Sequence, residues 1–212
     1  MASSKKNRGG KMSGKVGRTV TYPLYGEDVM RSIGVRKAPF TKNEIVAQMG
    51  MKVVQSFLNI IYPFICVGFE IEARLHRRNP QNVSFAYNRK NAVTGIYPDI
   101  GMDFPNVLVS KGDLSPPLNP RAMLSNRKVV FEWDYDPRAR RQHWSDQVMV
   151  LVYLPEIPDA VFITAGSSRE TKTASIDIPN YLTFSRLETY IAFISDDRKQ
   201  VSNSVYTGPL IP

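Results

Sequence analysis

The N-terminal part of the chain alternates between polar and apolar residues in a way that predicts a β-hairpin. Two extended runs between Lys15 and Ile33 flank the turn sequence Pro23-Leu24-Tyr25-Gly26, in which proline suits an early turn position and glycine tolerates a positive φ. Each strand is expected to gather its apolar positions on one side: Val16, Arg18, Val20 and Tyr22 on the first strand, and Val29, Arg31 and Ile33 on the second. An isolated two-stranded hairpin is marginal in water. We therefore expect a docking hairpin that rests on a protein surface through Val16, Val20, Tyr22, Val29 and Ile33.

The apolar spacing changes to a helical period after residue 42. Thr41-Lys42-Asn43-Glu44 has the pattern of a capping box. Behind it, apolar residues recur at helical spacing at Ile45, Met49, Val53, Phe57 and Ile60. Pro63 is expected to end or kink this helix. A second helix is predicted over 64–78, before Asn79-Pro80, and a short third helix over 81–92.

Short β-rich runs replace the helical pattern from residue 98 onward. Separated by turns rich in Gly, Pro and Ser, they lie at 102–109, 127–135, 147–154, 160–165, 173–178, 187–195 and 201–207. This density of short strands is typical of a small antiparallel sandwich of the immunoglobulin or fibronectin type. Tyr190 stands near the start of the penultimate strand, where such sandwiches place a tyrosine that bonds the backbone. The residues expected between the two sheets are Trp133, Val150, Val152, Ile191 and Phe193.

The predicted fold class is therefore α+β. It consists of a basic arm with a hairpin at 1–42, a helical segment at 43–97 and an immunoglobulin-like sandwich at 98–212. The 212 residues and the 42% hydrophobic content are those of a globular chain that can bury a core.

The positive charge is concentrated at the N-terminus. Residues 1–42 contain ten Lys and Arg and two acids, so they carry eight of the nine net positive charges of the chain. This asymmetry favours an acidic partner, either nucleic acid, an anionic surface or a neighbouring subunit. A solubilising tail is the alternative for the first eleven residues. The candidate cations for binding nucleic acid or a partner are Lys5, Lys6, Arg8, Lys11, Lys15 and Arg18.

The location and the membrane question follow from composition. The single Cys66 excludes an internal disulfide and a cysteine-built metal site. No apolar run of the signal-peptide type follows the basic N-terminus, so secretion by a signal peptide is not expected. The expected location is cytoplasmic or, for a particle component, the virion. The apolar content of residues 53–69 suggests a membrane-spanning helix as an alternative, but the segment includes several polar residues and Pro63. A buried helical pair is predicted instead, with no membrane partner.

The sequence HWSD contains the residue types of a catalytic triad in His143, Ser145 and Asp146. A triad needs spatial convergence rather than adjacency, and residues so close on a strand or turn do not all face one substrate atom. We therefore expect no hydrogen-bonded nucleophile–base geometry here. A Ser145–His143 contact near about 3 Å, with a third orienting carboxylate and inside a cleft, would contradict this expectation.

Other polar residues have structural explanations. Glu132, Asp134 and Asp136 share one side of a predicted strand and could hold a hard cation, but a solvated acidic face opposite a buried aromatic face fits them better. His76 stands among arginines at a helix end, where cations are favoured, and Cys66 is expected in the core. The sequence has no phosphate loop, dinucleotide fingerprint, HExxH motif or nucleophile elbow. It therefore predicts no enzyme, metal, cofactor or small-molecule substrate.

Three stretches resemble a family from Bacteroidota and their phages: SGKVGRTVTY with GEDVMRS, AYNRKNAVTGIYPD, and YIAFISDDRKQVSNSVYTG. The matching residues are Gly14, Lys15, Gly17 and Val20 of a Gly-Lys-x-Gly-x-x-Val motif, Asn88, Lys90, Asn91, Ala92 and Val93 in the second stretch, and Asn203, Ser204, Val205 and Tyr206 in the third. The resemblance implies a helical middle and a C-terminal immunoglobulin-like sandwich. It brings no settled activity, and it disfavours an extracellular enzyme.

Two functions remain after these exclusions. The first is a non-enzymatic assembly protein, such as a tail, connector or capsid-associated component of a phage or phage-like particle, which binds copies of itself or other particle subunits. The alternative is a nucleic-acid-binding protein that acts through its basic arm by salt-sensitive phosphate contacts. Tyr22 and Tyr25 are the only aromatic rings in the first 39 residues, which disfavours stacking on single strands.

Overall fold

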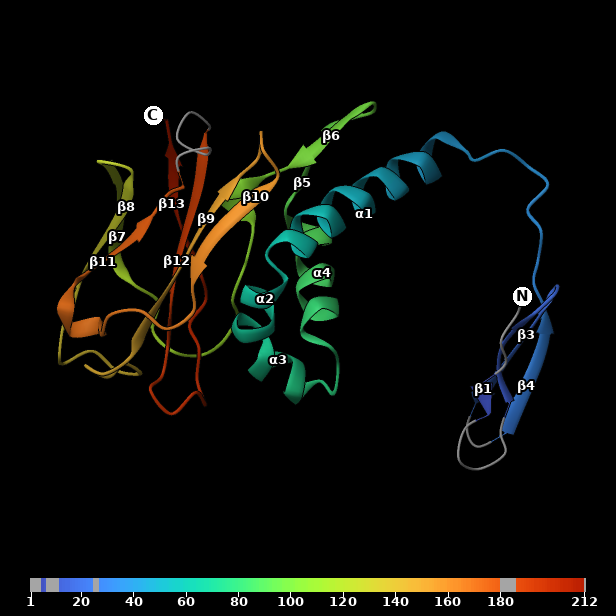
Figure 1. Ribbon diagram of the computed structural model, residues 1–212, viewed down its shortest axis with the longest axis horizontal. Coiled ribbons are helices and arrows are strands. Elements are labelled where there is room, and N and C mark those ends of the chain that lie inside the picture. The colour runs from blue at the N-terminus through green and yellow to red at the C-terminus, as the bar shows by residue number, and fades with distance from the viewer. Residues whose placement is uncertain (1–4, 7–11, 25–26, 180–185, 212) are drawn as a thin grey trace. The chain divides into compact units, whose positions relative to one another are not determined.

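The computed structural model describes residues 5–6, 12–24, 27–179 and 186–211 (Figure 1). The chain divides into two compact units, Met1–Thr41 and Lys42–Pro212. The first unit contains a small sheet, and the second contains the helices and the remaining strands.

The N-terminal unit is one antiparallel sheet in the order β1-β2-β3-β4. Its strands are β1 (Lys5–Lys6), β2 (Met12–Val16), β3 (Thr19–Leu24) and β4 (Glu27–Ser32). The predicted hairpin corresponds to β3 and β4, which pair along their full lengths, and its connecting residues 25–26 lie outside the described residues. The first predicted strand is split in two, because Gly17 takes a φ of 59° and closes a two-residue turn between β2 and β3.

This turn changes the predicted side of Val16. Val16 lies opposite Thr19 in the register, and directly paired residues share a face of the sheet. Val16 therefore belongs to the face of Thr19 and not to that of Val20, and Arg18 lies in the turn. The other apolar positions of β3 and β4 keep the predicted common side: Val20, Tyr22 and Val29.

The described part of the second unit opens with four helices. They are α1 (Lys42–Ile60), α2 (Tyr62–Gly68), α3 (Glu70–Leu75) and α4 (Pro80–Asn91). The predicted second helix is broken at Phe69, whereas α4 begins as expected after Asn79, whose side chain accepts a hydrogen bond from the Gln81 N–H at 2.8 Å. Pro63 occupies the first turn of α2, where proline is tolerated. In the described residues no single helix has the length and apolar content to span a membrane. The pair α1 and α2 has them only when the two helices are taken together, and the pair is bent by 86°.

The strands of the second unit form three antiparallel sheets in the described residues. A hairpin of β5 (Val93–Ile96) and β6 (Asp99–Met102) follows α4 and leads into the 3₁₀ turn η1 (Phe104–Asn106). A three-stranded sheet in the order β11-β8-β7 consists of β7 (Leu118–Ser125), β8 (Lys128–Asp134) and β11 (Thr173–Asp177), with the 3₁₀ turn η2 (Arg169–Thr171) before β11. A four-stranded sheet in the order β10-β9-β12-β13 consists of β9 (Gln147–Leu154), β10 (Asp159–Ile163), β12 (Leu187–Ile194) and β13 (Val205–Leu210).

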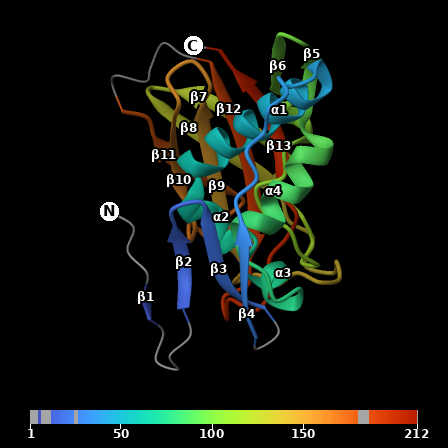
Figure 2. The ribbon, with the colours of Figure 1, turned by 90° about the vertical axis from the view of Figure 1, so that its right-hand side faces the viewer.

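The four-stranded sheet is the middle layer of three (Figure 1, Figure 2). One of its faces packs against the three-stranded sheet around Val150 and Trp133, and the other packs against the helices around Met149 and Phe57. Because both faces are covered, β12 is buried at every residue and β9 at all but its first. The predicted core is confirmed, since the residues expected between the two sheets are buried there: Trp133, Val150, Val152, Ile191 and Phe193.

The strand predicted at 102–109 is wrong. Its first part ends β6 and forms η1, and its later residues bond to side chains instead of a neighbouring strand. The Leu108 N–H donates to Asn88 Oδ1 and the Leu108 carbonyl accepts from Asn88 Nδ2, both at 2.9 Å. The Val109 N–H donates to the Ser204 hydroxyl at 3.0 Å. These side-chain partners satisfy a buried backbone, so the apolar run needs no strand partner.

Other strands also differ from the prediction in detail. β7 was not predicted, because it is an edge strand that contains Pro120 and exposes every second side chain or more. The β5–β6 hairpin was not predicted either, and β13 begins at Val205 instead of residue 201. The α+β class, with an N-terminal strand hairpin, helices and antiparallel sheets, is confirmed.

Candidate functional site

The N-terminal sheet is the first candidate because it lacks a core of its own. None of the described residues in 13–41 is buried. Large apolar side chains of this unit are 44–71% exposed: Val16, Leu24, Met30, Val35 and Phe40. Antiparallel sheets usually cover one face, and small sheets with no covered face are marginal in water. Within the described residues, the unit therefore buries little apolar surface of its own.

The predicted docking residues lie mostly on one face of this sheet. Half-buried apolar side chains of that face are Val20, Tyr22 and Val29. The Arg31 guanidinium lies 5.7 Å from the centroid of the Tyr22 ring. Ile33 extends the ladder, since its N–H donates to the Arg18 carbonyl at 2.7 Å. Val16, on the opposite face, is 53% exposed.

The structure describes two of the six predicted binding cations completely. Lys15 on β2 and Arg18 in the turn are exposed. Lys15 lies opposite Val20 in the register, which places a cation at the edge of the apolar docking face. The strand β1 is formed by Lys5 and Lys6, but their side chains, together with Arg8 and Lys11, lie outside the described residues.

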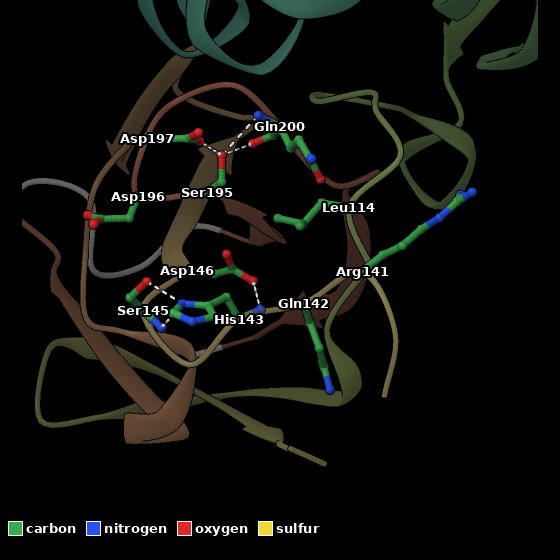
Figure 3. Close-up of a pocket in the computed structure, with 10 residues that line it drawn as sticks. All are labelled: Leu114, Arg141, Gln142, His143, Ser145, Asp146, Ser195, Asp196, Asp197 and Gln200. Atoms are coloured by element: carbon green, nitrogen blue, oxygen red, sulfur yellow. Dashed lines mark hydrogen bonds between the residues drawn. The ribbon is translucent and has the colours of Figure 1, made fainter. Parts of the chain in front are cut away.

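A polar pocket of about 410 Å³ lies between the loop 141–146 and the β12–β13 hairpin (Figure 3). Its lining residues are Leu114, Arg141, Gln142, His143, Ser145, Asp146, Ser195, Asp196, Asp197 and Gln200. The Ser195 hydroxyl donates to Asp197 Oδ1 at 2.8 Å, and this bond, with the Lys199 backbone N–H, lowers the pKa of Asp197. In Figure 3 the side chains of Arg141 and Asp196 point away from the centre of the pocket.

This pocket contains a serine–histidine contact within the HWSD sequence. Ser145 Oγ lies 2.7 Å from His143 Nδ1, so the two side chains do form a hydrogen-bonded pair, but the third carboxylate that would contradict the prediction does not orient the histidine. Asp146 does not act on the imidazole: its Oδ2 accepts from the backbone N–H of His143 at 2.8 Å and from Arg169 Nε at 3.0 Å. The Asp146 N–H in turn donates to the His143 carbonyl at 3.2 Å. The contact is part of a closed local turn, and the carboxylate that orients the histidine of a triad is directed elsewhere.

The arginine behind this turn is buried. Arg169 is 1% exposed, and it donates to Asp146 Oδ2 at 3.0 Å, to Gln142 Oε1 at 3.2 Å and to the Ser115 carbonyl at 2.8 Å. Its guanidinium carbon lies 3.8 Å from the centroid of the Phe193 ring. Burial lowers the pKa of Arg169, and the Asp146 carboxylate opposes that change. The arginine thus connects the loops of Ser115 and Gln142 to β12 through Phe193, and its charge is matched by Asp146.

A second buried acid lies on β12. Glu188 Oε2 accepts from the Tyr206 hydroxyl at 2.6 Å, and Glu188 Oε1 lies 2.6 Å from Arg186 Nε. Burial and then the bond to Glu188 raise the pKa of Tyr206, while burial and the Glu188 charge raise the pKa of Tyr190. Tyr190 does bond the backbone as predicted, but its partner is the carbonyl of the distant Phe104, at 2.9 Å. This network fastens η1 to the central sheet.

The acidic strand residues are exposed as predicted. On β8, Glu132 and Asp134 alternate with the buried Phe131 and Trp133, and Asp136 is exposed in the loop that follows. Within the described ranges, no group of three His, Cys, Asp or Glu side chains is arranged to hold a metal ion.

His76 and Cys66 also have local roles. His76 Nε2 lies 3.4 Å from Glu72 Oε1, and Lys111 Nζ lies 2.6 Å from the same oxygen. The hydrogen bond from Lys111 is the main reason that the pKa of Glu72 is lowered. Cys66 on α2 is half-buried, at the edge of the core instead of inside it.

An apolar groove of about 500 Å³ lies along one side of α1. Its α1 wall consists of Met49, Lys52, Val53, Ser56, Phe57 and Ile60. Its other walls come from the β6–η1 segment and from the β9–β10 turn: Met102, Phe104, Tyr153, Pro155 and Pro158. Sequence reasoning missed this groove because three distant segments build it. The helical periodicity identified its α1 wall only as a core-facing stripe.

Two stretches that carry the family resemblance meet at one segment of the second unit. Asn88 holds Leu108 from both sides, as described above, and the Gly112 N–H donates to Asn203 Oδ1 at 3.1 Å. Ser204 accepts from the Val109 N–H at 3.0 Å. These residues fix the chain between η1 and β7, which is a structural role.

The chain belongs to a family of unknown function (DUF6266), whose model matches residues 10–208. The match includes the described strands β2 to β4 as well as the helices and sheets of the second unit. No curated protein matches the chain.

Proposed function

We propose that this protein is a non-enzymatic structural protein that assembles with other subunits through its N-terminal sheet. One observation carries the proposal: no described residue in 13–41 is buried, although Met30 and Val35 are 68% and 71% exposed. Exposed apolar side chains without a covering layer favour an interaction surface; Met30 lies opposite Thr21, on the face of the sheet that does not carry Val20 and Tyr22. Covering these side chains contributes roughly 25 cal/mol per Å² of apolar area, which is the stabilisation that a small sheet lacks when free.

The assembly that we propose is a phage or phage-like particle, with the protein in the virion, or in the cytoplasm before assembly. We also propose that the two packed sheets of the second unit form an immunoglobulin-like sandwich. The resemblance to a family from Bacteroidota and their phages supports both. The polar groups of the pocket in Figure 3 support a role without catalysis, because Asp146 is directed to Arg169 and to the backbone.

Deletion of residues 1–34 tests the proposal. Size-exclusion chromatography with light scattering should show association of the full chain, or its co-purification with particle subunits, and a monomer for the deletion variant. The melting temperature of the second unit should stay the same. A full chain that is strictly monomeric at high concentration and captures no partner contradicts the proposal. A deletion that only lowers the melting temperature shows that the sheet rests on its own chain.

The alternative function is nucleic-acid binding through the basic arm. The exposure of Lys15 and Arg18 favours it, since each cation that neutralises a phosphate adds to the salt dependence of binding. Affinity for duplex DNA measured between roughly 50 and 200 mM salt should fall steeply, and the double variant Lys15→Ala with Arg18→Ala should reduce the logarithmic slope by roughly 2. No binding at about 50 mM salt, or a flat slope, removes this alternative.

A further inference from the structure

We propose that the apolar groove of one copy of the chain binds the N-terminal sheet of a second copy. The inference rests on the proposed assembly function and names the surface that receives the sheet. Most of the groove walls are apolar, and the α1 residues Met49, Val53 and Ile60 remain partly exposed. A groove of about 500 Å³ has room for several apolar side chains.

The charged residue among those that line the groove is Lys52, but the two segments that build the walls opposite α1 are acidic beside their lining residues. The β6–η1 wall, residues 99–106, contains Asp99 and Asp103 and no basic residue. The β9–β10 turn, residues 155–159, contains Glu156 and Asp159 and again no basic residue. Residues 1–41 contain nine Lys and Arg against two acids. Opposite charges at the rim steer association and fix its orientation.

One face of the sheet combines the two features that this groove requires. Its apolar centre consists of Val20, Tyr22 and Val29. Lys15 lies opposite Val20, and so does Arg31 on the other side of β3. The apolar centre therefore matches the apolar lining of the groove, and the two cations match the acidic residues of the neighbouring segments.

Two full-length variants separate the two halves of the proposed contact. The groove variant carries Met49→Glu and Val53→Glu, and the sheet variant carries Val20→Asp and Val29→Asp. Controls are Met51→Glu, on the same helix and 43% exposed but outside the groove, and Thr21→Asp, on the opposite face of β3. Sedimentation velocity should show each double variant as a monomer, with a dissociation constant raised at least about thirtyfold. The two controls should associate like the unmodified chain.

Mixing the two double variants provides the decisive result. Each retains one functional half, so the mixture should form a one-to-one pair in which the sheet of the groove variant occupies the groove of the sheet variant. Circular dichroism checks that both variants are folded. If the groove variant does not fold, Glu156→Lys on the exposed turn replaces it, and its dissociation constant should rise several-fold and depend less on salt.

The outcomes distinguish this inference from the function on which it rests. A groove variant that still associates like the unmodified chain, while the sheet variant does not, overturns the groove as the receiving surface and leaves the assembly function standing. A sheet variant that associates normally contradicts both. Variants that are each monomeric but form no mixed pair also overturn the inference.

Discussion

Replacing the buried Arg169 by alanine is expected to destabilise the second unit strongly. The substitution removes hydrogen bonds to Asp146, Gln142 and the Ser115 carbonyl, and it removes the cation from the face of the Phe193 ring. Asp146, 1% exposed, then loses its ion-pair partner. Breaking a buried ion pair from one side costs about 3–5 kcal/mol. For a unit of this size, that loss lowers the melting temperature by roughly 10 °C.

Urea denaturation followed by tryptophan fluorescence measures this loss directly. Trp133 reports on the site, because its indole N–H donates to the Arg169 carbonyl at 2.8 Å. Arg140→Ala is the matched control: Arg140 is exposed on the neighbouring loop, and its replacement should change the stability by less than about 0.5 kcal/mol. Asp146→Asn should cost a similar amount to Arg169→Ala, and the double variant should lose less than the sum of the two. A loss below about 1 kcal/mol for Arg169→Ala would refute the reasoning.

Two further substitutions test other parts of the second unit. Gly68→Ala should lower the free energy of unfolding in urea by about 1–3 kcal/mol, because an added Cβ would lie 2.5 Å from the Val109 carbonyl oxygen. The control Gly101→Ala, whose added Cβ has no atom within 4 Å, should change the stability little. Equal effects of the two substitutions would contradict the packing. Glu72→Gln should destabilise the protein at neutral pH, since the hydrogen bond from Lys111 lowers the pKa of Glu72. A carboxyl with a lowered pKa stabilises the folded protein at pH values above its ordinary pKa of roughly 4.3, and this stabilisation is lost as the pH falls through the folded-state pKa. The difference in unfolding free energy between the unmodified protein and the variant should therefore shrink in acid. A difference that does not depend on pH would contradict the account.

The elements with strong periodicity could be predicted from the sequence, and the elements that rely on side-chain partners could not. The strand β9 is apolar at all but its first residue, and β12 is apolar over its second half, because both faces of their sheet are covered. The helix α4 begins where Asn79 caps it. The run at 102–109 has the composition of a strand, but Asn88 and Ser204 supply its hydrogen bonds. No spacing rule could reveal these partners, which lie up to 95 residues away in the chain.

The candidate site could be predicted from the sequence only in part, for similar reasons. Alternation identified the face of Val20, Tyr22 and Val29, but a turn at Gly17 moved Val16 to the other face. Adjacency in HWSD does not favour catalytic geometry, and Asp146 does not orient the histidine; a turn nevertheless brings Ser145 and His143 together at 2.7 Å. The apolar groove could not be predicted from the sequence, because its walls come from segments that meet only in the folded chain.

Amide hydrogen exchange of β3 and β4, measured as a function of protein concentration, tests the central claim that the N-terminal sheet is stabilised by docking on another subunit. In dilute protein the amides of 19–32 should exchange fast, because the sheet has no buried side chain in the described residues. At a concentration about 100 times the dissociation constant their exchange should slow by roughly 100-fold, while the amides of β12 stay equally protected at both concentrations. Protection of 19–32 that is already high in dilute monomer, and that does not change with concentration, would contradict the account.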